Sequence, residues 1–204
     1  MTRIKICGNT RAEDVELALS VGVDLLGFIF TRSKRQISIT EGAALVADIP
    51  ESVERVGVFI DEPPAVIAQA IDRCRLTAAQ IYRPITAEDR RLGVALLPAL
   101  RMRPGLGPVD HGVLPSDRIV LDTWTDESDG GGSGRTWDWG VAEALARQHR
   151  VIVSGGLNAA NVDQAVATLA PWGVDVCGGV ESAARQKDPA KLRAFVAAVR
   201  GADR

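Results

Sequence analysis

The stretch Arg3-Ile4-Lys5-Ile6-Cys7, followed by the turn Gly8-Asn9-Thr10, has the pattern of a β-strand that ends at a glycine. Because successive side chains of a strand point to opposite faces, the two isoleucines share one face, while Arg3, Lys5 and Cys7 share the other. The apolar face is expected to pack against a helix. The other face brings a thiol to the carboxyl end of the strand, which is where α/β enzymes place reactive side chains. Taken alone, the stretch favours the alternative of a small buried cysteine without a chemical role.

Beyond this stretch, short apolar segments alternate with amphipathic helical patterns at a spacing of about 25 residues. Such alternation is typical of βαβ units and a parallel sheet. Only a short helical turn is expected at 86–91 and little regular helix at 101–115, which is rich in proline and glycine. We expect strands at 3–7, 24–30, 54–60, 76–81, 93–97, 118–122, 150–154 and 174–177, and helices at 12–21, 40–48, 63–74, 138–147, 158–170 and 188–200.

Eight such units predict an α/β fold, namely a closed (β/α)₈ TIM barrel, and the chain is at the small end of that fold's size range. No linker or change in composition divides the chain, so a single domain over residues 1–204 is expected. The alternative is an open flavodoxin-like sheet, which would need only about five or six strands. Helix starts are expected at Thr40 with Glu41, at Asn158, and at Asp188-Pro189.

The composition is that of an ordinary globular protein, with 46% apolar and 25% charged residues among 204. A net charge of −2 argues against nucleic acid or an anionic membrane as a partner. Three cysteines without metal-like spacing argue for a reducing, cytoplasmic location and against a metal centre. The first residues have a strand pattern where a signal peptide would have its apolar run, so no signal peptide is expected. No apolar segment approaches the roughly 18 residues that a membrane span needs.

In a barrel of this kind the active site is built at the carboxyl ends of the strands. Strands one and eight become neighbours when the barrel closes, so Cys7 and Cys177 are both expected near its mouth. This proximity also predicts that the two thiols can form a disulfide under oxidation. Read in order, the strand ends are Cys7, Phe30 with the loop 31–35, Asp61, Tyr82, Arg101, Asp122, Gly155-Gly156 and Cys177-Gly178-Gly179.

Two pairs of glycines follow the last two expected strands, Gly155-Gly156 and Gly178-Gly179, the second before a short helical turn at 180–184. Bare backbone N–H groups beside a helix start attract anions, and barrels often bind phosphate in the loops after strands seven and eight. We therefore predict a phosphate site here. The alternative is that these glycines only form tight turns.

The long segment 123–137 is interpreted as a lid loop, with Gly132 and Gly134 in its glycine-rich run. A linker without such a role is the alternative. The run is not a P-loop, because no Gly-Lys-Ser/Thr follows in the required register.

Asp122 ends the sixth strand and is expected to face the barrel interior, as is Asp175 on the eighth strand. A carboxyl group among apolar strands can have a raised pKa and act as a general acid. A buried charge needs a partner, so Asp175 is expected to pair with Lys5 across the seam between strands one and eight. From spacing alone, structural roles are favoured for both aspartates.

Taken together, these motifs resemble the phosphoribosylanthranilate isomerase family of tryptophan biosynthesis. Each motif is weak by itself, but their order and spacing along the whole chain are highly specific. They are Lys5–Gly8, Gly27–Phe30 with Ser33 and Arg35, Val56–Phe59, Leu121–Thr123, Gly131–Trp139, Gly155–Asn158, Val174–Val176, Gly179–Glu181 and Lys187-Asp188.

The resemblance implies a single-domain barrel, as a monomer or homodimer, that binds a small phosphosugar and needs no cofactor or metal. The reaction would be an Amadori rearrangement of N-(5′-phosphoribosyl)anthranilate to 1-(2-carboxyphenylamino)-1-deoxyribulose 5-phosphate. The positions of Asp122 and Cys7 would supply the general acid and general base. That of Arg35 would contact the anthranilate carboxylate, and the glycine loops would hold phosphate. Tyr82 and Asp175 are further candidates for substrate binding, and Tyr82 is expected either to keep a hydrogen bond or to stack on the anthranilate ring.

The chain departs from the family pattern at several of these positions. Tyr82-Arg83 stands where the family usually has His-Gly, Cys177-Gly178 where it usually has two serines, and Lys34 where it usually has proline. Backbone N–H groups survive the change at 177–178, so phosphate binding should survive too. The departures at 82–83 favour the alternative of a barrel that binds a phosphosugar without turnover, or with altered specificity. We further expect Lys5 to lower the pKa of Cys7.

Overall fold

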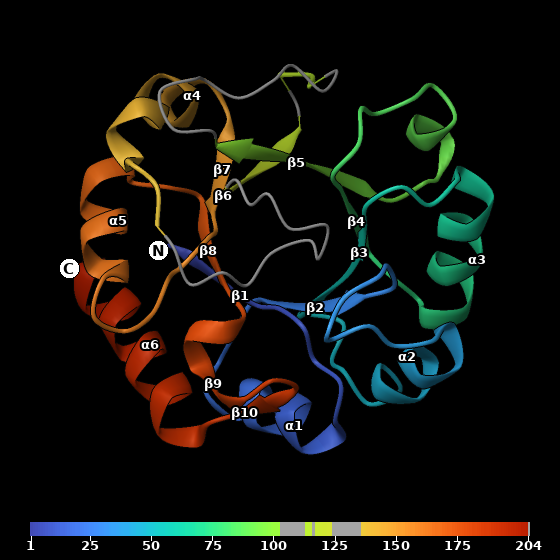
Figure 1. Cartoon of the computed structure of the whole chain (residues 1–204), viewed down its shortest axis with the longest axis horizontal. Helices are drawn as coiled ribbons and strands as arrows, with labels where there is room; N and C mark the ends of the chain where they lie inside the picture. Colours follow the sequence, from blue (N-terminus) through green and yellow to red (C-terminus); the bar gives the residue numbers. More distant parts are fainter. Residues whose placement is uncertain (103–112, 116, 124–135, 204) are drawn as a thin grey trace.

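The computed structural model describes residues 1–102, 113–115, 117–123 and 136–203, and its centre is a closed parallel barrel. Figure 1 looks down this barrel, with the helices arranged around its outside. Each strand pairs with the next in the chain, and the first pairs with the eighth, which closes the barrel and excludes the open-sheet alternative. The strands are β1 Arg3–Ile6, β2 Leu25–Ile29, β3 Glu54–Phe59, β4 Ala78–Ile81, β5 Ala95–Met102, β6 Arg118–Thr123, β7 Arg150–Val153 and β8 Gly173–Val176.

Six α-helices lie in the described part of the chain and cover the outer face of the barrel (Figure 1). The connection from β4 to β5 holds only a short 3₁₀ turn, as its sequence predicts, and a second 3₁₀ turn precedes α4. The bounds are α1 Ala12–Ser20, α2 Ile39–Leu45, α3 Pro64–Cys74, α4 Glu143–Gln148, α5 Val162–Leu169 and α6 Pro189–Ala202, with the two 3₁₀ turns at Asp89–Arg91 and Trp139–Ala142.

Alternation along each strand divides the core into two layers. Ile4 and Ile6 of β1 lie in the larger layer, between the barrel and its helices, as the sequence pattern predicts. The smaller layer fills the barrel interior with side chains such as Val56, Leu97 and Ile152. Lys5 is completely buried in this inner region. The outward-facing side chains of each strand therefore pack against the helices, while the inward-facing ones fill the barrel interior below its mouth.

Two of the three expected helix starts are wrong in detail. The cap of α2 is Ser38 rather than Thr40, because the Ser38 hydroxyl accepts from the Glu41 N–H while the Glu41 carboxylate accepts from the Ser38 N–H. Asn158 stabilises the turn before α5 through the Ala160 N–H, but α5 itself begins four residues later. Asp188 does cap α6, accepting from the N–H groups of Ala190 and Lys191.

After β8 the chain makes a 3₁₀ turn at Gly178–Val180 and then a small hairpin of β9 Glu181–Ala183 and β10 Gln186–Lys187. The helical turn expected at 180–184 is therefore wrong in position. In Figure 1 this hairpin lies close to α1. It carries Glu181 and Lys187, whose side chains contact Arg35, Cys7 and Cys177.

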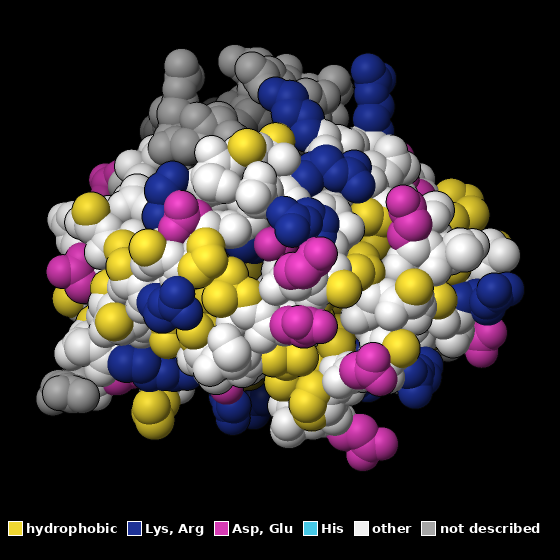
Figure 2. Space-filling view, turned by 90° about the horizontal axis from the view of Figure 1, so that it is seen from below, with side chains coloured by type: hydrophobic (Ala, Val, Ile, Leu, Met, Phe, Trp, Pro, Cys, Tyr) yellow, Lys and Arg dark blue, Asp and Glu magenta, His cyan; other side chains and the backbone are white. Residues whose placement is uncertain are grey.

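The surface mixes charges of both signs. On the face seen in Figure 2, Lys and Arg side chains are interspersed with Asp and Glu. None of the helices described is long and apolar enough to cross a membrane.

Candidate active site

A cavity of about 410 Å³ opens at the carboxyl ends of the strands. Gly132 and Gly134 lie outside the described residues, as does most of the expected lid at 123–137. The cavity is lined by Cys7, Arg35, Tyr82, Asp122, Gly155, Gly156, Asp175, Gly178 and Gly179, together with Gln80, Ser154 and Cys177.

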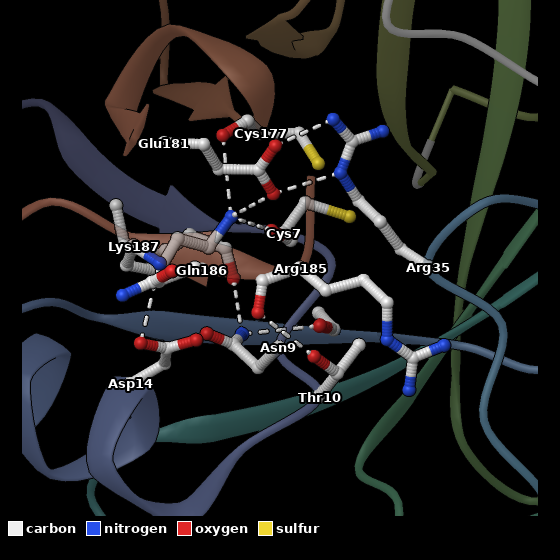
Figure 3. A network of polar contacts seen from close by, with 12 residues as sticks. Cys7, Asn9, Thr10, Asp14, Arg35, Cys177, Glu181, Arg185, Gln186 and Lys187 are labelled. Atoms are coloured by element: carbon white, nitrogen blue, oxygen red, sulfur yellow. Dashed lines mark hydrogen bonds and ion pairs between the residues drawn. The ribbon is translucent and has the colours of Figure 1, made fainter. Parts of the chain in front are cut away.

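Cys7 and Cys177 form a pair of neighbouring thiols. Each follows directly on its strand, and β1 and β8 are paired with Ile6 opposite Val176. The Cys7 N–H donates to the Val176 carbonyl over 2.9 Å, which continues this pairing to the two cysteines. In Figure 3 both sulfur atoms lie on the side of the network that faces Arg35.

The two thiols have opposite pKa shifts because they interact with each other. Interaction with Cys177 and burial raise the pKa of Cys7 well above its ordinary value. The same interaction lowers the pKa of Cys177 to about 7, with help from the positive charges of Lys187 and Arg35. Lys5 does act to lower the pKa of Cys7, as expected from the sequence, but its effect is outweighed. Within the pair, Cys177 is therefore the thiol that ionises more readily.

Lys187 ties the ends of β1 and β8 together. Its fully buried ammonium group donates to the carbonyls of Cys7 (2.6 Å) and Cys177 (3.2 Å) and contacts the Glu181 carboxylate at 3.3 Å. Figure 3 shows these three contacts converging on one nitrogen atom. Because both carbonyls follow strand ends, this one cation fixes the backbone that carries the thiols.

Arg35 is held by a bidentate ion pair with Glu181. Its Nε and Nη2 donate to the two carboxylate oxygens over 2.8 and 2.6 Å, and both side chains are largely buried. Burial opposes the ionised form of Glu181, but Arg35 and Lys187 lower its pKa overall, so the carboxylate stays charged. The Nη1 edge of the guanidinium is not used in this pair, which leaves N–H donors at the cavity wall for an anionic group.

Asp122 lies at the same barrel mouth as the thiols, on β6, which is separated from β8 by β7 and from β1 by β7 and β8. Burial raises the pKa of its carboxyl group, against the opposing effect of two hydrogen bonds. The Tyr82 hydroxyl donates to Oδ2 over 2.6 Å, and the Thr123 N–H donates to Oδ1 over 2.8 Å. Raised in this way, the pKa favours a protonated group that can serve as an acid.

Asp175 forms the expected ion pair with Lys5 across the β1–β8 seam, at 2.9 Å. Burial opposes the charge on Lys5, but Asp175 and Cys7 outweigh it and raise the pKa of the ammonium group. The second carboxylate oxygen, Oδ1, is buried and has no hydrogen-bond partner within the described chain. Asp175 thus combines a structural ion pair with one acceptor that remains available at the cavity.

The glycine loops after β7 and β8 are in direct contact. A Cβ atom on Gly179 would lie 1.9 Å from the Leu157 carbonyl oxygen, so only glycine permits this approach. Gly155 and Gly156 have φ values of +88° and +67°, in the left-handed region that glycine adopts readily. Neither of their N–H groups is hydrogen-bonded to another described residue. These loops can therefore offer backbone donors to an anion.

The departure at Arg83 does not affect the cavity. Its guanidinium points to the loop after β4, where it forms two hydrogen bonds with Asp89, of 2.6 and 2.8 Å, and donates to the Glu62 carbonyl. The departure at Tyr82 does affect it, because the phenol contacts Asp122 directly.

Sequence reasoning missed the parts that Glu181, Lys187 and Gln80 play in the site. Glu181 and Lys187 stand in motifs quoted above, but their partners Arg35 and Cys7 come from the other end of the chain and leave no local signal. Gln80 points inward from β4 and donates to the Tyr82 hydroxyl over 3.1 Å. Within the described residues, no cluster of His, Cys, Asp and Glu side chains is arranged to bind a metal ion.

Comparison with known proteins gives a consistent match along the whole chain. The model of the family "N-(5′phosphoribosyl)anthranilate (PRA) isomerase" matches residues 4–198. The N-(5′-phosphoribosyl)anthranilate isomerase of Pelobacter propionicus is 36% identical over 199 residues, covering 96% of this chain and 94% of the relative. The Listeria monocytogenes enzyme of the same name is 35% identical, covering 98% and 99%.

Solved structures agree with the sequence matches. The phosphoribosyl anthranilate isomerase of Thermotoga maritima superposes with a TM-score of 0.83 at 30% identity, over 98% of this chain and 100% of the other. Another structure of such an isomerase, in complex with reduced 1-(o-carboxyphenylamino)-1-deoxyribulose 5-phosphate, gives a TM-score of 0.81 at 28% identity, with the same coverage. From its sequence and its barrel alike, this chain belongs to the N-(5′-phosphoribosyl)anthranilate isomerase family.

Proposed function

We propose that this protein is a phosphoribosylanthranilate isomerase of tryptophan biosynthesis, which converts N-(5′-phosphoribosyl)anthranilate into 1-(2-carboxyphenylamino)-1-deoxyribulose 5-phosphate. The observation that supports this most is that two groups from different strands line one cavity: a carboxyl with a raised pKa and a pair of thiols in which the pKa of Cys177 is lowered to about 7. One acid and one base acting on different atoms of a single sugar are what an Amadori rearrangement requires.

In the proposed mechanism, Asp122 protonates the ribose ring oxygen, and the bond from that oxygen to C1′ breaks. The anthranilate nitrogen supplies the electron pair, which gives an open-chain iminium ion. The thiol pair, acting through Cys7, then removes the proton from C2′, and the electrons of that C–H bond neutralise the iminium to give an enolamine. Tautomerisation of the enolamine gives the ketone. The acid and the base both act inside a cavity walled by buried strands, where water competes weakly with them.

Binding is assigned to the rest of the cavity wall. We infer that Arg35, oriented by Glu181, contacts the anthranilate carboxylate, because its second guanidinium edge matches a planar anion. Gly155, Gly156, Gly178 and Gly179 hold the phosphate, supported by the N–H groups after β7 that no described residue accepts from. Asp175 accepts from a sugar hydroxyl through Oδ1, the oxygen that Lys5 does not contact.

We further infer a cytoplasmic enzyme, a monomer or homodimer, with residues 1–204 as one domain and 123–137 as its lid. Three free thiols support a reducing compartment. A dimeric phosphoribosylanthranilate isomerase is known from Thermotoga maritima, and monomers generated from it share the fold of this chain with a TM-score of 0.82. Sedimentation of the purified chain separates the two oligomeric states.

The proposal is tested by turnover of N-(5′-phosphoribosyl)anthranilate, followed through the loss of anthranilate fluorescence. We expect the wild-type chain to be active and Cys7→Ala and Asp122→Asn each to lower kcat by about 10²–10⁴-fold, because each removes a proton-transfer group. Cys74→Ala, the same change at a free cysteine on α3 outside the cavity, is the matched control and should retain kcat. Binding of a product analogue without turnover by the wild type would instead indicate a non-catalytic barrel.

A further inference from the structure

The Tyr82 side chain, at the end of β4, extends past β5 to the carboxyl group of Asp122 on β6. It follows β4, whereas Asp122 belongs to β6, and its hydroxyl donates to Asp122 Oδ2 over 2.6 Å. Both residues are buried at the inner end of the cavity. The phenol ring is flanked by Arg101 of β5, whose guanidinium carbon lies 5.1 Å from the ring centroid. This side chain is thus placed by contacts on several sides.

From this geometry we propose that Tyr82 is a positioning residue for the general acid Asp122, with Gln80 orienting the phenol, rather than a contact for the anthranilate ring. This inference rests on the proposed function, because it concerns how Asp122 is oriented to donate its proton in that reaction. The chain reads Gln-Ile-Tyr-Arg where its family usually reads Gln-Leu-His-Gly, so the arrangement belongs to this sequence.

The hydrogen bonds around Asp122 account for its orientation. Thr123 N–H occupies Oδ1 and the Tyr82 hydroxyl occupies Oδ2, so the plane of the carboxyl group is fixed at both oxygens. Gln80 Nε2 donates to the phenol oxygen over 3.1 Å and thereby directs the phenol's own hydrogen toward Asp122. A carboxyl held at both ends presents its proton in one direction only, which is what a general acid must do.

The same contact changes during the reaction. When Asp122 gives its proton to the ring oxygen of the sugar, it becomes a buried carboxylate. A hydroxyl hydrogen bond stabilises this charged form more than the neutral form. Tyr82 therefore makes Asp122 a stronger acid than burial alone would allow, and it does so at the moment when charge develops on the carboxyl group.

The first test is kinetic. In Tyr82→Phe, we expect the alkaline limb of the pH profile of kcat/KM to move up by about one to two pH units, because a hydrogen bond to a charged group is lost. We expect kcat near neutral pH to fall about tenfold or more, and KM to change less than twofold, since the ring remains. An unchanged alkaline limb together with a raised KM would overturn the proposal in favour of direct substrate contact.

A double-mutant cycle separates action through Asp122 from independent action. In an Asp122→Asn background, the further change Tyr82→Phe should leave the residual rate within about twofold. Additive losses would show that Tyr82 acts on something else. Ser20→Ala, at the exposed end of α1 and outside the cavity, serves as the control variant.

A second readout needs no turnover. Tyr82 is the only tyrosine in the chain, so the rise in phenolate absorbance near 295 nm on alkaline titration reports on this residue alone. Burial and the nearby Asp122 raise the pKa of Tyr82 well above its ordinary value. In Asp122→Asn the absorbance should rise at clearly lower pH than in wild type, with folding followed by circular dichroism. Identical titrations would overturn the contact even if the enzyme proved active, and an inactive chain with shifted titrations would overturn the function but not the contact.

Discussion

At the scale of single residues, the proposed base, Cys7, is the group whose surroundings sequence patterns describe least completely. Alternation along the first strand places Cys7 on the inner face, and closure of the barrel predicts that Cys177 lies near it, but neither pattern shows that Cys177 takes the lower pKa. That property arises from a neighbouring thiol and from Lys187 and Arg35, which come from distant parts of the chain. Asp122 was easier to find, because a carboxylate ending an apolar strand is visible in the sequence itself.

The thiol pair predicts sensitivity to peroxide. The Cys177 thiolate should attack hydrogen peroxide to give a sulfenic acid and hydroxide, and the Cys7 thiol should then displace water to form a disulfide. We expect turnover to be lost, the mass of the chain to fall by about two hydrogens, and dithiothreitol to restore both. Cys177→Ser should form no such disulfide under the same treatment. Loss of activity without the mass change would contradict this prediction.

At the scale of elements, most strands and helices could be predicted closely because period-two and period-3.6 patterns are local. The fifth strand, expected at 93–97, instead runs from Ala95 to Met102. The cap of α2 could not, since Ser38 and Thr40 both precede Glu41 and only the path of the backbone decides which hydroxyl meets an N–H group. The turn after β8 was misplaced for a similar reason, because the contact between Gly179 and Leu157 that fixes it joins two different loops.

That contact predicts different tolerance at two adjacent glycines. Gly179→Ala should weaken binding of inorganic phosphate strongly and lower stability by a few kcal/mol, because its methyl group would overlap the Leu157 carbonyl oxygen. Gly178→Ala is the matched comparison, since a Cβ there would have its nearest neighbour, Arg35 Nη2, at 3.4 Å. Phosphate titration and urea unfolding of the two variants measure the difference. Equal effects at both positions would contradict the close packing of the two loops.

At the scale of the whole molecule, the closure of the barrel depends on the seam between β1 and β8. The closed barrel could be predicted from the number of βαβ units, and the ion pair across the seam from the need of a buried charge for a partner. What could not be predicted is how completely the pair is enclosed: Lys5 has no exposed surface, and Asp175 is 4% exposed.

This enclosure predicts unequal costs for single and double substitution. Lys5→Met leaves an uncompensated buried carboxylate and should destabilise the fold by about 3–5 kcal/mol. The double variant Lys5→Met/Asp175→Leu removes both charges and should recover a large part of that loss. Urea unfolding monitored by circular dichroism gives the two free energies. A double variant less stable than Lys5→Met would contradict the prediction.

Lys187 joins the backbone after the first strand to the backbone after the eighth, two segments separated by about 170 residues. During synthesis the ribosome releases Cys7 early and Cys177 near the end, so the two thiols cannot come together until most of the chain has been made. Such long-range contacts also form late when a polypeptide refolds from denaturant. Recovery of catalysis should therefore follow the slowest phase of refolding, after the helical signal has already returned.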